Sequence, residues 1–357
     1  MAASVSDYAA GTIAGAQSSA GVRVWLWFVA ALVFAMIVVG GATRLTDSGL
    51  SITEWQPLLG AIPPLNDADW HTAFEKYKAI PQYSIVNAGM DLEAFKAIYW
   101  WEWAHRFLGR FIGVAFALPF LFFWITGKVR GRFALMCLGV FALGGLQGGI
   151  GWYMVKSGLV DRIDVSQYRL ALHLVTAFAI LSLLVWLALT ATPAGERIRF
   201  TVTAGQRRTA VGLFLLVFAQ SGLGALVAGL NAGLTYNTWP LMDGKLVPDG
   251  LLAHKPWYVN FFENVTTVQF DHRIVAYAVV ALALVHLVSL IRSADDERVV
   301  ASATLLAVCL VAQMLIGIAT LLMGVPLALG LVHQGGAAIV IAAATLHLHR
   351  ITRAAPV

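Results

Sequence analysis

Eight apolar runs, each long enough to cross a bilayer, are the feature that most limits how this chain can fold. The runs lie at residues 24–43, 98–127, 134–155, 170–191, 209–230, 266–291, 299–323 and 326–348. A spanning helix needs about 20 mostly apolar residues, and a backbone in lipid has to satisfy its own hydrogen bonds. The composition agrees, because 59% of the residues are hydrophobic and only 12% are charged. We therefore predict an all-α integral membrane protein with eight transmembrane helices.

The basic residues between these runs indicate the orientation of the chain. With the N-terminus inside, twelve Lys and Arg residues fall in short inner segments, and nine fall in much longer outer loops that also carry many acidic residues. Short cytoplasmic loops are enriched in Lys and Arg. We expect both termini on the cytoplasmic side of a bacterial inner membrane, surrounded by lipid. The net charge of +5 is then explained by topology, without a nucleic acid partner.

The N-terminal segment and the two cysteines carry little further information. Residues 1–22 contain no basic segment followed by an apolar segment and a cleavage site, so we predict a disordered cytoplasmic tail rather than a signal peptide. Cys137 and Cys309 both lie in apolar runs, and the outer loops hold no cysteine. A disulfide framework is therefore excluded, and we expect both thiols to pack as small apolar groups.

The second half of the chain repeats the first. The segment TDSGLSITEW (46–55) follows the first run, and LNAGLTYNTW (230–239) follows the fifth; QGGIG (147–151) and QMLIG (313–317) lie in the third and seventh. A repeat with an even number of spans keeps one orientation, so this is a parallel duplication. We predict two tandem four-helix bundles, residues 23–191 and 209–350, joined by a cytoplasmic linker at 192–208. Gln147 and Gln313, which recur in the repeat, are expected to bridge helices.

Four histidines recur with the repeat at one depth. His105 in the second run corresponds to His272 in the sixth, and His173 in the fourth corresponds to His333 in the eighth. Each is expected to lie within about two turns of the outer end of its helix. One pair of imidazoles from two helices at matching depth can supply both axial ligands of a haem iron. A lone membrane histidine is more often a packing or proton-relay residue, but the duplication favours haem; zinc is disfavoured because neither cysteines nor enough carboxylates accompany the imidazoles.

The fragments around these histidines resemble a known family across essentially the whole chain. EWAHRFLGR, RLALHLVTA, FDHRIVAY and LVHQGGA, together with the repeated loop, are similar to the haem A synthase family. The resemblance implies that the C-terminal unit holds a permanent haem b through His272 and His333. It also implies that the N-terminal unit receives haem O as the substrate, with His105 and His173 facing its iron.

The resemblance also implies the reaction and its partners. A ring methyl group of haem O is oxidised to a formyl group, which gives haem A for terminal oxidases. A haem O synthase is the expected supplier of the substrate, and the electron acceptor is not identified by the sequence. Some members of the family carry a cysteine pair in the first outer loop, and this chain has none. That departure puts in doubt a thiol-based route for electrons, but not the haem sites.

The two halves differ at one position beside a proposed ligand. Glu102 precedes His105 by three residues, whereas the matching residue before His272 is Gln269. Positions i and i−3 share a helix face, so Glu102 is expected to point toward the same porphyrin as His105. It is a candidate for stabilising positive charge or for acting as a base toward water. The alternative is that Glu102 only pairs with Arg106 or Arg110.

The two matched arginines, Arg106 and Arg273, are candidates for binding haem propionates, because guanidinium groups bind carboxylates in bidentate fashion.

A rival interpretation rests on two further histidines. His286 and His347 each lie fourteen residues after a proposed ligand, about 21 Å along a helix. This spacing is typical of a di-haem transmembrane cytochrome b that transfers electrons. Against it, the matching positions of the first half are Pro119 and Leu187. A transporter is disfavoured because the repeats are not inverted.

Overall fold

The computed structural model describes residues 19–56, 59–161, 163–191, 201–294, 296–353 and 355–356. Within these residues, eight helices are long and apolar enough to cross a membrane. They are α2 (Ala20–Leu45), α5 (Leu92–Ile125), α6 (Gly131–Asp161), α7 (Gln167–Thr190), α8 (Ala204–Gly229), α10 (Val265–Ser293), α11 (Glu297–Leu322) and α12 (Leu327–Thr352). The predicted all-α membrane fold is confirmed.

The remaining elements are short. They are η1 (Leu59–Ala61), α3 (Asp67–Lys78), α4 (Pro81–Ile85), η2 (Ala232–Leu234), η3 (Trp257–Val259), α9 (Asn260–Glu263), and the strands β1 (Thr201–Val202) and β2 (Ala355–Pro356). The two strands pair in parallel. All the other short elements lie in the two long loops between α2 and α5 and between α8 and α10.

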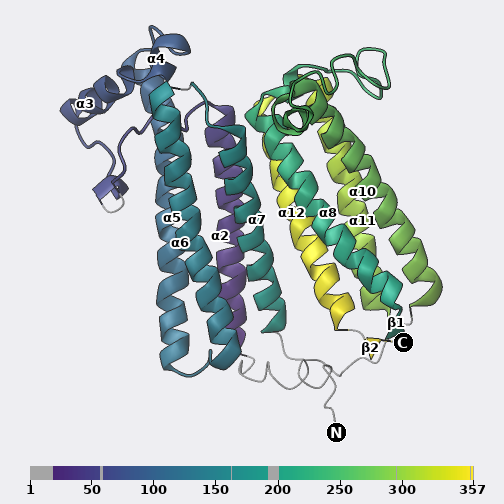
Figure 1. Cartoon of the computed structure of the whole chain (residues 1–357). Coiled ribbons are helices and arrows are strands. Elements are labelled where there is room, and N and C mark those ends of the chain that lie inside the picture. Colours follow the sequence, from purple (N-terminus) through teal and green to yellow (C-terminus); the bar gives the residue numbers. More distant parts are fainter. Residues whose placement is uncertain are drawn as a thin grey trace.

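The long helices stand side by side in two groups (Figure 1). One group holds α2, α5, α6 and α7, and the other holds α8, α10, α11 and α12. The groups meet where α7 packs against α8 and α12, and where α12 packs against α2. One apolar cluster, which includes the fully buried Leu26, Leu184, Leu213 and Ile341, runs through both groups.

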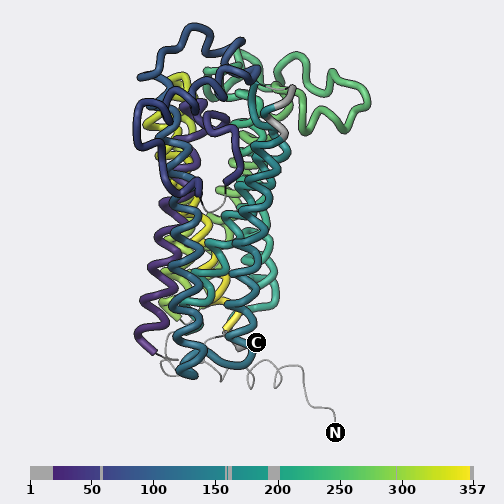
Figure 2. The backbone as a smooth tube through the Cα atoms, turned by 90° about the vertical axis from the view of Figure 1, so that its left-hand side faces the viewer, coloured from purple at the N-terminus to yellow at the C-terminus, as the bar shows by residue number. Residues whose placement is uncertain are grey.

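The two long loops gather at one end of the bundle. Figures 1 and 2 show the segments 46–91 and 230–264 at the same end, while the short connection between α5 and α6 lies at the opposite end. The start of α2 and the end of α12 also lie at that opposite end. This arrangement follows from an even number of spans, and we refer to the end with the long loops as the loop end.

Two predicted boundaries shift in the structure. Residues 1–18 of the predicted tail lie outside the described residues, but α2 begins at Ala20, so residues 20–22 are helical rather than tail. Residues 192–200 of the predicted linker also lie outside them, whereas residues 204–208 belong to α8. The reason is a capping box, in which Thr203 and Gln206 satisfy each other's backbone N–H groups and start the helix early.

The first long loop folds into a cap that the sequence analysis did not predict. Helix α3 is capped by Asn66, whose side chain accepts a hydrogen bond from the N–H of Asp69. It packs against the first turns of α5, while α4 contacts α3 and α6. The core of this cap contains Trp70, Phe74, Tyr77, Phe95 and Tyr99. Because α5 takes part in the cap, it begins at Leu92, six residues before the predicted apolar run.

Candidate functional site

The four predicted histidines form two facing pairs with nearly the same geometry. His105 on α5 faces His173 on α7 with 6.4 Å between ring centroids and 71° between ring planes. His272 on α10 faces His333 on α12 with 6.5 Å and 83°. Each pair joins two helices of one group, as the duplication requires.

This spacing fits a metal held between the two rings. A metal–imidazole nitrogen bond is about 2 Å long, and the nitrogen lies about 1.2 Å from the ring centre, so two imidazoles on one iron have centroids about 6.4 Å apart. The measured separations of 6.4 and 6.5 Å match this value. The residues present therefore fit a six-coordinate haem iron in each half.

Three of the four histidines lie at the predicted depth. His173, His272 and His333 come six, seven and six residues after the first residue of their helices. His105 lies thirteen residues after Leu92, so the expectation of two turns is wrong for this residue. The difference arises because α5 continues beyond the bundle into the cap.

Each of the four rings rests against a glycine of a neighbouring helix. A Cβ added at Gly40, Gly151 or Gly224 would lie 3.1 to 3.2 Å from the ring of His105, His173 or His272, respectively. At Gly317 it would lie only 2.8 Å from Cε1 of His333. An alanine at any of the first three positions would press on the imidazole, and at Gly317 it would force the ring to shift.

Glutamines hold three of the four histidines by their backbone. The side-chain amides of Gln147, Gln220 and Gln313 donate to the carbonyl oxygens of His173, His272 and His333 over 2.8, 2.9 and 2.7 Å. The predicted bridging role of Gln147 and Gln313 is confirmed. Gln220 was missed, although the segment QSGLG (220–224) in the fifth run carries the same glutamine and glycine as QGGIG and QMLIG.

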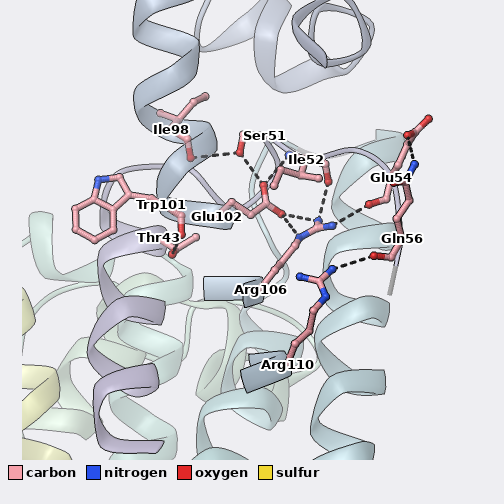
Figure 3. A network of polar contacts seen from close by, with 10 residues as sticks. All are labelled: Thr43, Ser51, Ile52, Glu54, Gln56, Ile98, Trp101, Glu102, Arg106 and Arg110. Carbon is pink, nitrogen blue, oxygen red and sulfur yellow. Dashed lines mark hydrogen bonds and ion pairs between the residues drawn. The ribbon is translucent and has the colours of Figure 1, made fainter. Parts of the chain in front are cut away.

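Glu102 lies buried at the centre of a polar network (Figure 3). Its Oε2 accepts hydrogen bonds from the Ser51 hydroxyl at 2.8 Å and the Ile52 backbone N–H at 2.7 Å. Its Oε1 accepts from Nε and Nη2 of Arg106 at 3.0 and 2.6 Å. The carboxylate therefore ties the first outer loop to α5, and its predicted pairing with Arg106 is present.

The two matched arginines bind matched carbonyl groups. Arg106 donates to the backbone oxygens of Ile52 and Glu54, and Arg273 donates to those of Tyr236 and Thr238, the same positions in the repeated loop. Gln269, the counterpart of Glu102, donates to the Tyr236 oxygen at 3.1 Å. Each half thus pins its outer loop through an arginine, but only the first half adds a carboxylate.

A cavity opens beside Arg106 at the loop end of α6. It has a volume of about 220 Å³ and is lined by Trp55 of the outer loop and by Trp152 and Lys156 of α6, among others. The Lys156 ammonium lies 5.0 Å from the centre of the Trp152 ring. Two cationic side chains, Arg106 and Lys156, therefore border this indentation, and Arg106 directly follows His105 in α5.

The third histidine pair has a different geometry. His286 and His347 are buried, their Nε2 atoms lie 2.9 Å apart, and their ring centroids are separated by 5.1 Å. Nδ1 of His347 also contacts the Ser302 hydroxyl at 3.0 Å. Two iron–nitrogen bonds need about 4 Å between the nitrogens. These rings are hydrogen-bonded to each other and leave no space for an iron.

Comparisons with known proteins show what the whole chain is similar to. Residues 23–345 match the family model described as "Cytochrome oxidase assembly protein". The chain is 51% identical to the "Heme A synthase" of Allorhizobium ampelinum, over 98% of this chain and 95% of the relative. It is 53% identical to the "Heme A synthase" of Azorhizobium caulinodans, over 95% and 96%. The corresponding protein of a Chelativorans strain is 52% identical, over 94% and 91%.

Proposed function

The chain belongs to the haem A synthase family, and from this premise we propose how its two halves divide the reaction. The protein is a membrane oxidoreductase of haem A biosynthesis, which converts haem O into haem A for terminal oxidases. This division of roles is supported by the two matched histidine pairs, one in each half. In both pairs the separation of the ring centroids suits two imidazole ligands on one iron. We assign residues 23–191 to substrate binding and the second group of helices, from α8 to residue 350, to a permanent haem b; the part of the chain between residue 191 and α8 connects the two.

In the C-terminal half, His272 and His333 are proposed to hold haem b. The bound haem supplies an iron that can accept and release one electron. The two imidazoles are kept apart at the required spacing by Gln220 and Gln313, which fix their backbones, and by the glycines on which the rings rest. This rigid arrangement suits a cofactor that stays bound throughout turnover.

In the N-terminal half, His105 and His173 are proposed to bind the iron of haem O. Glu102 lies one turn before His105 on the same helix, so the porphyrin held by His105 extends past this carboxylate. Arg106 and Lys156 both border the neighbouring cavity and are placed to attract the propionates. Arg273 is the matching candidate for the haem b propionates.

Glu102 is proposed as the catalytic carboxylate. Oxidising a methyl group to a formyl group builds positive charge on the carbon before oxygen from water is added, and a nearby carboxylate stabilises that charge or accepts a proton from the water. Arg106 and the loop donors hold the carboxylate in a single orientation. The neutral Gln269 at the same place in the other half is consistent with a site that only holds its haem.

The setting and the partners complete the proposal. We place both termini in the cytoplasm and both histidine pairs toward the outer face of a bacterial inner membrane, because the inner segments carry the excess of Lys and Arg. A haem O synthase supplies the substrate, and an electron acceptor yet to be identified removes the electrons released by the oxidation.

The rival function, a di-haem electron-transfer cytochrome, requires His286 and His347 to hold a second iron. Their direct hydrogen bond argues against it.

The test of the proposed function uses membranes that contain this chain and a source of haem O. Wild-type protein should produce haem A, identified by the absorbance of its formyl group and by the mass of the extracted pigment. Glu102→Gln should instead accumulate haem O or a partly oxidised porphyrin, while haem b content stays unchanged. Ser51→Ala serves as the matched variant, because it removes one contact of the network and keeps the carboxylate. Undiminished haem A in Glu102→Gln would refute the catalytic role.

A further inference from the structure

The four histidines are each held by a neighbouring helix with the same short segment, and one of the four differs. The segments are MIVVG (36–40) on α2, QGGIG (147–151) on α6, QSGLG (220–224) on α8 and QMLIG (313–317) on α11. In each, the last residue is the glycine that supports a histidine ring. The first residue is glutamine in three segments and methionine in the one that faces His105.

The glutamine links its own helix to the backbone of the histidine on the neighbouring helix. Gln147, Gln220 and Gln313 each donate to the backbone oxygen of the histidine whose ring rests on the glycine one turn further along. A hydrogen bond between membrane helices contributes about 1 kcal/mol and fixes their relative position. Because the ring and the backbone of the histidine are then held by the same helix, the imidazole nitrogen has little freedom to move away from an iron.

Met36 makes a different contact. A thioether has no hydrogen to donate, so Met36 cannot bind the carbonyl oxygen of His105. Its terminal methyl group instead lies against α5 at Gly109, one turn beyond His105, where an added Cβ would be 3.3 Å away. This contact is apolar and non-directional. His105 is therefore supported by Gly40 but is not fixed through its backbone in the way the other three are.

We propose that Met36 makes His105 the releasable axial ligand of the substrate iron, while the three histidines held by glutamine remain in place. The inference rests on the proposed function and adds to it which of the two N-terminal histidines withdraws. Release on the His105 side opens the substrate iron on the side from which Glu102 projects, since the two residues share one face of α5. It also lets haem O enter and haem A leave, whereas haem b stays bound.

The test exchanges the residue types between the two halves in the purified full-length protein. With haem O as the probe, Met36→Gln should increase the low-spin fraction in the absorption and electron paramagnetic resonance spectra. Transfer of haem O to apomyoglobin should become about fivefold slower, the factor that corresponds to one added hydrogen bond. Gln220 occupies on α8 the position that Met36 occupies on α2. The Gln220→Met variant should therefore release haem b about fivefold faster. Met136→Gln, at a half-buried methionine near the other end of α6, controls for a glutamine placed in a span.

The outcomes separate this inference from the proposed function. Unchanged haem O retention in Met36→Gln, together with faster haem b loss in Gln220→Met, would overturn the role of Met36. If Met36→Gln does not accumulate in membranes, Gln147→Met is measured instead. Removing the donor to His173 should speed the release of haem O. An unchanged rate would refute the idea that the glutamine hydrogen bond holds the histidine in place. A wild-type protein that binds haem b but shows no six-coordinate haem O would overturn the proposed N-terminal site itself.

Discussion

The tightest contact between a glycine and one of the four histidine rings gives the sharpest prediction, which is the substitution Gly317→Ala at the proposed haem b site. The new Cβ would lie 2.8 Å from Cε1 of His333. Two carbons in contact lie about 3.5 to 4.0 Å apart, so the ring has to retreat by about 0.7 Å or more. Metal–ligand distances in real sites hold to within about 0.2 Å, so a shift of this size would break the proposed bond from His333 to an iron.

The free energy of unfolding of the same variant should fall by no more than about 2 kcal/mol. Overpacking costs about 1 to 3 kcal/mol, but alanine is favoured over glycine inside a helix by about 1 kcal/mol, which offsets part of the cost. A loss of haem without a loss of fold therefore distinguishes displacement of the ligand from general damage. We expect several-fold less haem b per protein, measured as the pyridine haemochrome, and a weaker low-spin signal.

The control for this prediction is Gly212→Ala on α8. A Cβ there meets nothing within 4 Å, so haem b content should equal that of the wild type. Circular dichroism and thermal unfolding of both variants report on the fold. If Gly317→Ala keeps its haem b and its low-spin spectrum as fully as Gly212→Ala does, the placement of His333 as an axial ligand against α11 is wrong.

Three further predictions concern regions outside the two haem sites. His286→Ala and His347→Ala should each leave haem content unchanged and lower the free energy of unfolding by about 1 to 3 kcal/mol, because the remaining imidazole loses its buried partner; loss of a haem in either variant would contradict this. Burial raises the pKa of Tyr77 above 10.0, so the unfolded cap ionises first, and stability of the cap should fall as pH rises above 10. Tyr77→Phe should weaken that dependence, as followed by tryptophan fluorescence. Arg44→Ala should loosen the contact between the halves, since Arg44 donates to the Asn231 side chain at 2.9 Å, and more rapid hydrogen exchange around residue 231 would show it.

The eight helices and the four histidines were predictable because both leave strong marks in sequence. A transmembrane helix needs a long apolar run. In a duplicated chain, a histidine found at the matching position of both halves supports the assignment in each. The cap was missed because α3 is short and polar on its exposed side, and its core forms only when residues of α5 pack against it. The partners of Glu102 were missed for a similar reason. Ser51 and Ile52 lie about fifty positions earlier in the chain, and a backbone donor has no sequence pattern.

The support of the histidines was only partly visible in sequence. The match between Gln147 and Gln313 is plain because both stand in the same place of the repeat, in the third and seventh runs. Gln220 in the fifth run and Met36 in the first stand at that place of a different helix, and their residue types differ. The glycine contacts needed the structure, because glycine is common in membrane helices for several reasons. What distinguishes these four glycines is a ring within 3.2 Å of the absent Cβ, which depends on the crossing of two helices.

The role of Glu102 can be argued from the half of the protein that lacks it. Arg106 and Arg273 bind equivalent carbonyl oxygens, so each loop is pinned by its arginine whether or not a carboxylate is present. A buried ion pair contributes little net stability compared with a neutral alternative, and Gln269 provides such an alternative in the second half. Holding the loop therefore does not explain why the first half keeps a buried carboxylate beside its histidine pair. The same comparison predicts that Glu102→Gln folds with its loop in place, because Arg273 keeps its contacts next to a glutamine. Its loss of haem A formation can then be attributed to the missing charge.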